Sequence, residues 1–161
     1  MQKLLVSAFA GLCAILIGVS AAWALPSKPQ LTLEVAEKAA IAAYNYAEAK
    51  GWKMNVAVLD AGGGLLYFRR NPDAFLGSVD ISINKAWTAT QFGFPSRLFG
   101  EVVVKRAEGI QLTPRLIIFP GGLPIKAGEA LIGGIGVSGA TGDQDEECAQ
   151  AGLDAVKDLL K

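Results

Sequence analysis

The feature that most constrains this chain is a glycine-rich apolar run near its C-terminus. Residues 131–139 read LIGGIGVSG and contain the pattern G-x-G-x-x-G. A dinucleotide-binding fold needs a strand, a glycine turn, a helix and a second parallel strand. Here the first glycines lie inside the apolar run, and one predicted helix occupies the residues that follow. We therefore expect no nucleotide-binding βαβ unit, and the absence of G-K-[ST] argues against a P-loop.

The same glycines leave one stretch of a predicted strand almost without side chains. Glycine weakens a strand, so several together indicate that another group must come close to the backbone. Two interpretations stay open. A helix packs tightly on the bare strand, or a flat ligand lies over it and uses it as the floor of a shallow pocket.

Periodicity predicts an α+β fold, a mainly antiparallel sheet of about five strands with packed helices. Asn55 to Asp60 and the LLYFRR run that follows AGGG read as a hairpin. Thr32 and Ser78 are candidate helix N-caps. The predicted helices are 32–50, 78–92, 95–105 and 143–159, and the predicted strands are 55–60, 65–70, 115–119, 123–126 and 129–138.

The N-terminus has the pattern of an export signal. A basic residue, Lys3, precedes an apolar run, and Ala22-Trp23-Ala24 forms an A-x-A cleavage site. We expect residues 1–24 to be cleaved, 25–30 to form a tether and 31–161 to form one domain. The predicted location is periplasmic or secreted, with no membrane contact after cleavage. Acidic and basic residues balance at 15 each, so we expect no nucleic-acid partner.

The chain contains no histidine. This removes the usual zinc sites, the Ser-His-Asp and Cys-His catalytic groups, and the common proximal haem ligand. We predict no catalytic residue and assign no metal ligand, so the composition favours a binding protein over an enzyme. After cleavage Cys148 is the remaining cysteine, which leaves no partner for an intrachain disulfide.

Several motifs occur in a specific order along nearly the whole mature chain, from about Leu31 to Ala155. They are VAVLDAGGGLLYFRR, SVDISINKAWTAT and PGGLPIKAGEALIGGIGVSGATGDQDEECAQAGLDA. Together they resemble the GlcG/HbpS-like family, also called the haem-degrading-domain family. The chain departs from the family pattern after the second strand, where RRNPDA replaces the common R-M-D-G-A.

The resemblance implies a profilin- or PAS-like fold and assembly into homo-oligomers, commonly octamers. It also implies a haem or tetrapyrrole ligand, because characterised relatives include secreted haem-binding proteins. Some haem-binding relatives use a histidine ligand, which this chain lacks. The iron would then be held by another side chain or by none. The candidate iron ligands are Tyr44, Tyr46, Met54, Tyr67, Lys85 and Cys148.

We predict one ligand-binding site, and each of its residues also has an ordinary structural interpretation. Lys85 and Arg69 suit a carboxylate, but they also suit a solvated helix and a charged edge strand. Phe119 could stack on a flat ring, with backbone N–H groups nearby for an anion. The full set is Tyr67, Arg69, Lys85, Thr88, Phe119, Gly121, Gly122 and Ser138.

An acidic cluster at residues 143–147 suits either a metal ion or simply the positive end of a helix.

The sequence supports three hypotheses for function. The leading one is an exported haem- or tetrapyrrole-binding protein that sequesters or delivers its ligand. The alternatives are an enzyme or accessory protein that binds a small hydroxy acid, and an oligomeric module without a ligand.

Overall fold

The computed structural model describes residues 27–161, so the predicted signal peptide lies outside the described residues. A four-stranded antiparallel sheet forms the centre, in the order β2-β1-β4-β3. The α+β fold is confirmed, with four strands in the sheet rather than five. The main elements are α1 (Leu33–Ala49), β1 (Asn55–Asp60), β2 (Leu65–Arg69), α2 (Ser78–Phe92), β3 (Gly122–Ala127), β4 (Ala130–Ser138) and α4 (Gly142–Asp154).

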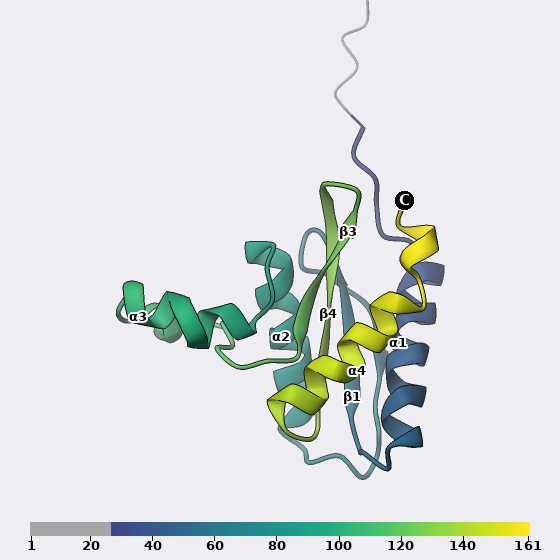
Figure 1. Ribbon diagram of the computed structural model, residues 1–161, viewed down its shortest axis with the longest axis horizontal. Helices are drawn as coiled ribbons and strands as arrows, with labels where there is room; N and C mark the ends of the chain where they lie inside the picture. Colours follow the sequence, from purple (N-terminus) through teal and green to yellow (C-terminus); the bar gives the residue numbers. More distant parts are fainter. Residues whose placement is uncertain (1–26) are drawn as a thin grey trace, which may run out of the picture.

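Helices cover both faces of the sheet (Figure 1). α1 and α4 lie side by side on one face, and their small side chains pack on Val56, Val58, Ile135 and Val137 to form the main core. α2 lies on the other face, where Ala86 packs on a second set of β1 side chains. The alternation of inward and outward residues along β1 therefore fills both cores.

The bare stretch of β4 is a packing surface for α2. A Cβ at Gly136 would lie 2.1 Å from the carbonyl oxygen of Ser82, and one at Gly134 would lie 2.7 Å from that of Ala86. The backbones of helix and strand thus approach too closely for any side chain between them. The interpretation of these glycines as the floor of a ligand pocket is wrong, because α2 already occupies that space.

A helical arm, residues 94–119, connects α2 to β3 and extends away from the sheet (Figure 1). It contains the π-helix Phe99–Val103, α3 (Val104–Arg106) and a short 3-10 turn, Ile110–Leu112. The predicted helix at 95–105 is therefore partly present. The predicted strand at 115–119 is absent, because its polar backbone atoms bond to side chains of α2 and the arm rather than to a neighbouring strand.

The predicted caps had mixed outcomes. Thr32 caps α1 by accepting from Val35 N at 3.3 Å, as predicted. α2 has Gly77 as its N-cap, because the Ser78 hydroxyl instead donates to Phe75 O and accepts from Asn55 Nδ2. The buried stripe of α1 consists of Ala36, Ala39, Ala40, Ala43 and Ala47.

The C-terminal helix is shorter than predicted. α4 ends at Asp154, and a separate 3-10 turn, Lys157–Leu159, follows it. Cys148 and Val156 are buried, whereas Leu159 is exposed. Within residues 27–161, no helix is long and apolar enough to cross a bilayer.

Candidate functional site

A pocket of about 280 Å³ lies where α2, the loop after the arm and the start of α4 meet. We call it the Lys85 pocket. Its walls combine apolar and polar groups, which is typical of small-molecule sites. Its apolar lining is Phe75, Ile81, Phe119 and Pro120, and its polar side chains are Lys85, Ser138, Asp143 and Asp145.

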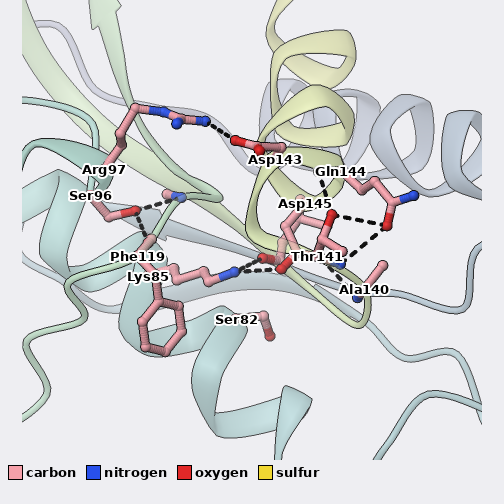
Figure 2. A network of polar contacts seen from close by, with 12 residues as sticks. Ser82, Lys85, Ser96, Arg97, Phe119, Ala140, Thr141, Asp143, Gln144 and Asp145 are labelled. Carbon is pink, nitrogen blue, oxygen red and sulfur yellow. Dashed lines mark hydrogen bonds and ion pairs between the residues drawn. The ribbon is translucent and has the colours of Figure 1, made fainter. Parts of the chain in front are cut away.

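Lys85 is buried, with only 1% of its surface exposed, and it joins three elements. Its Nζ lies 2.6 Å from Asp145 Oδ2 on α4 and 3.0 Å from the carbonyl oxygen of Val137 on β4 (Figure 2). Lysine is rarely buried unless it is paired. The alternative interpretation of Lys85 as a solvated helix residue is therefore wrong.

The pKa values of this pair shift in opposite directions. Burial lowers the pKa of the Lys85 ammonium, although the Asp145 carboxylate opposes this effect. Burial likewise raises the pKa of the Asp145 carboxyl, against the effects of Lys85 and of nearby backbone N–H groups. Both shifts favour the neutral form of the group, amine or acid, more than water does.

The first turn of α4 holds Asp145 in place. The Asp145 Oδ1 atom accepts a hydrogen bond from Ala140 N at 3.1 Å. Thr141 is the N-cap, and it forms a reciprocal capping box with Gln144. The box uses Thr141 and Gln144, so Asp145 is free to reach Lys85.

Gly121 and Gly122 pack against the Lys85–Asp145 ion pair rather than forming a binding site for an anion. The N–H of Gly122 donates to Ser96 Oγ at 2.9 Å, so it is not available to an anion. Gly121 has a φ of +117°, and a Cβ there would lie 2.7 Å from Lys85 Nζ. Glycine is therefore required for the loop to pass over the ion pair.

Two predicted residues lie at the pocket surface. The Phe119 ring centroid is 5.5 Å from Lys85 Nζ, within range of a cation–π contact, and 45% of the residue is exposed. Ser138 ends β4, lines the pocket and is 2% exposed. Its hydroxyl makes no side-chain hydrogen bond to any residue that the structure describes, so it has capacity for a ligand.

Thr88 supports the pocket from outside it. Its hydroxyl donates to Asn84 O at 2.8 Å and accepts from the N–H of Ile117 at 3.0 Å. It thereby fixes the returning end of the arm against α2. This is a positioning role rather than the ligand contact that we predicted.

Tyr67 and Arg69 lie on the opposite face of the sheet from Lys85. They pair with Val58 and Val56 of β1, on the side covered by α1. The Arg69 guanidinium carbon is 4.3 Å from the centroid of the Tyr44 ring. The hypothesis that Arg69 and Lys85 hold one carboxylate together is therefore wrong, because α2 and α1 lie on different faces.

The acidic cluster at the start of α4 is neutralised by basic side chains. Arg97 bonds Asp143 at 2.6 Å (Figure 2). It also bonds Glu146 at 3.0 Å and contacts Glu101 of its own arm helix. These hydrogen bonds raise the pKa of Arg97 further above its ordinary value. Among residues 27–161, no group of three His, Cys, Asp or Glu side chains is arranged to hold a metal ion.

Sequence reasoning missed three of the residues that define the site. Asp145 was grouped with its acidic neighbours, although its partner lies 60 positions earlier. Arg97 and Phe75 were not selected, because an arginine and a phenylalanine in loop-like segments carry no periodic signal. The one available signal was the acidic run itself. It indicates that basic side chains lie nearby, but it does not identify them.

Known proteins resemble the chain in sequence and in structure. The model of the family described as "Haem degrading protein HbpS-like" matches residues 31–154. A 15.0 kDa protein from the dhaT–dhaS intergenic region of Citrobacter freundii is 40% identical over 137 residues, which covers 80% of this chain and 94% of the relative. The Escherichia coli K12 protein GlcG is 32% identical over 71% of this chain and 85% of its own length.

Two solved structures share the fold at substantial identity. The crystal structure of HbpS superposes with a TM-score of 0.78 at 36% identity and covers 82% of this chain and 94% of that one. A PduOC–haem complex superposes with a TM-score of 0.75 at 30% identity and covers 79% of this chain and 95% of that one. The family match and the two superpositions agree over nearly all of the described residues, and the chain therefore belongs to the HbpS-like family of haem degrading proteins.

Proposed function

We propose that this chain is an exported protein that binds haem or another tetrapyrrole and sequesters or delivers it. Family membership and the haem complex of PduOC support the ligand class. The A-x-A pattern at the N-terminus supports export. N-terminal sequencing of the protein recovered outside the cytoplasm tests the export, with Leu25 as the expected first residue.

The observation that carries the ligand proposal is an aromatic mouth on the Lys85 pocket. Phe75 and Phe119 both line the pocket, and about half of each is exposed. Exposed aromatic rings that gather at one cavity mark a binding surface more often than scattered ones do. A flat, apolar macrocycle would cover these rings and gain stacking as well as buried area.

Around the aromatic mouth the described residues fit the flat ring of a tetrapyrrole rather than an iron-ligating haem site, and the candidate ligand Tyr67 lies on the opposite face of the sheet. Met54 and Cys148 are fully buried in the core, and Lys85 is 1% exposed within a pocket of about 280 Å³, which is too small to admit a macrocycle. Burial also raises the pKa of Cys148 to about 12, so its thiolate is scarce. The hydroxyls of Tyr46 and Tyr44 are engaged by Glu147 and Asn71. We therefore propose that contacts with the macrocycle, rather than a side chain on the iron, hold the ligand.

This proposal is tested by comparing hemin with iron-free protoporphyrin IX. Both should bind with similar affinity, measured by quenching of tryptophan fluorescence. Phe119→Ala should weaken both by roughly tenfold, since an aromatic contact of about 1 kcal/mol is lost together with buried area. Leu33→Ala on α1 is the matched control, because Leu33 is similarly exposed at 57% and lies away from the pocket.

Two results would contradict the proposal. Spectra that match free hemin, with no quenching, would show that the protein does not bind the ligand. Equal losses in the two variants would show that the aromatic mouth is not the binding surface.

We also propose that the protein assembles with copies of itself through the arm. The arm extends away from the sheet (Figure 1) and carries Val102 and Leu112, which are 38% and 81% exposed. Apolar side chains on a projecting segment gain free energy when a second surface covers them. The family resemblance supports this reading, and a second copy of the chain is the partner that we propose.

A further inference from the structure

Two polar groups of the Lys85 pocket have hydrogen-bonding capacity that the fold does not use. Lys85 Nζ contacts Asp145 and Val137 O, which leaves the third position on a group with three donors. The Ser138 hydroxyl lines the same pocket, and no other described side chain bonds it. Both groups line the pocket, so both are suited to bind a ligand atom.

We propose that this pocket takes small carbonyl compounds, aldehydes above all, and that Lys85 condenses with them to form a Schiff base. A lysine held away from water, with a proton carrier beside it, suits such chemistry. Asp145, at 2.6 Å, is that carrier. Ser138 is placed to donate a hydrogen bond to the carbonyl oxygen. This inference is separate from tetrapyrrole binding, since it concerns the polar base of the pocket rather than its aromatic mouth.

The step balances without any oxidant or reductant. Proton transfer from Lys85 to Asp145 leaves a neutral amine, whose lone pair turns into the pocket by rotation about Cε–Nζ. The nitrogen attacks the carbonyl carbon, the C–N bond forms, and the oxygen takes up the proton from Asp145. Asp145 then carries a second proton from the nitrogen to the same oxygen. Loss of that oxygen as water gives an iminium ion beside the Asp145 carboxylate, so the pocket again holds one positive and one negative charge.

The dimensions of the pocket limit which carbonyl compounds fit. Its volume of about 280 Å³ lies just below the range for small-molecule sites, which begins at about 300 Å³. Phe75, Ile81 and Phe119 give it apolar walls. Aldehydes with a short apolar chain are therefore the expected class, whereas sugars would leave several hydroxyls without partners.

Reductive trapping on the intact protein tests this inference. The purified chain is incubated with propionaldehyde and sodium cyanoborohydride at pH 6, digested and mapped by mass spectrometry. At that pH a lysine side chain in water, whose reference pKa is about 10.4, is almost entirely protonated and reacts slowly. Propylation of Lys85 should be at least about tenfold faster than that of the exposed Lys126 and Lys161.

The native protein alone tests whether Lys85 is labelled faster, and a variant tests which side chain assists it. Ser138→Ala should slow labelling of Lys85 several-fold and leave the exposed lysines unchanged, which act as an internal control. Labelling of Lys85 no faster than that of the exposed lysines in the native protein would overturn the inference. An unchanged rate in Ser138→Ala would overturn the role of the hydroxyl. Neither result would affect the comparison of hemin with protoporphyrin, so the two proposals fail separately.

Discussion

Lys85 and Asp145 are both held out of water, and each would be unstable as a charge if the other were removed. The pair is almost fully buried, with side-chain exposures of 1% and 3%. Removing one partner of a buried pair typically costs about 3–5 kcal/mol, whereas replacing both by apolar groups is often neutral or stabilising. The pair therefore need not stabilise the fold, and a function of the pocket is a better explanation for its presence.

The first prediction concerns the pH dependence of this pair. Asp145 has a folded-state pKa raised above 3.8, so its stabilising contribution is present in acid and is lost as pH rises. Lys85 has a folded-state pKa lowered below 10.5, so its contribution is present in alkali and is lost as pH falls. The net cost of the pair should therefore be greatest around neutral pH.

Urea unfolding of the wild type and of Lys85→Met/Asp145→Leu measures this cost. The double variant should be as stable as the wild type or up to about 4 kcal/mol more stable at pH 7, with a smaller advantage towards pH 4 and pH 10. Lys85→Met alone should lose about 3–5 kcal/mol. A double variant less stable than the wild type at pH 7 would show that the pair is a net stabiliser.

At the scale of elements, the contact between α2 and β4 depends on the absence of side chains on one face of the strand. A Cβ at Gly136 would lie 2.4 Å from Ala86 N, as well as clashing with the Ser82 carbonyl oxygen. Both of these atoms belong to the helix backbone, so no rotamer change relieves the overlap. The helix must instead move away from the sheet.

We predict that Gly136→Ala lowers the free energy of unfolding by about 1–3 kcal/mol or more, the usual cost of overpacking. Thermal or urea unfolding measures it. The matched control is Gly77→Ala, where a Cβ would make its nearest contact at 3.6 Å and φ is −62°, so little change is expected. A variant at position 136 as stable as the control would show that α2 has room to move.

Elements with local signals could be predicted from the sequence. The AGGG turn between two apolar runs gave the β1–β2 hairpin, and Thr32 gave the start of α1. The predicted strand at 115–119 was wrong because RLIIF has strand-like composition. Its backbone partners are the side chains of Thr88 and Ser96, and no periodicity reveals them.

The candidate site was predictable in its residue types but not in its arrangement. Lys85, Phe119 and Ser138 do line one pocket. Tyr67 and Arg69 do not join them, because assigning a strand residue to a face says nothing about which helix covers that face. The pairing of Lys85 with Asp145 depends on the complete sheet, so it is beyond any reasoning from local spacing.

At the scale of the whole molecule, the arm is the part that the rest of the fold explains least. Its helical turns stand away from the sheet, and Leu112 is 81% exposed. Arg97 and Thr88 tie only its two ends to the body. A projection that packs on little of its own chain is suited to contact another copy.

We predict that Val102→Glu/Leu112→Glu lowers the assembly state, since buried carboxylates without partners oppose association. Light scattering should give a mass of several chains for the wild type and a mass nearer that of one chain for the variant. Leu159→Glu, at an exposed position outside the arm, is the control. A wild type with the mass of a single chain would contradict the proposed assembly.

The ion pair beneath the pocket joins residues that are 60 positions apart, on two elements that β3 and β4 separate in the chain. Such a contact closes a long loop, so it forms only after the local hairpin and helices are in place. The pocket is thus a late product of folding. A ligand in the pocket binds the completed fold and not its partly folded forms. By mass action it therefore stabilises the state in which the Lys85–Asp145 contact is formed.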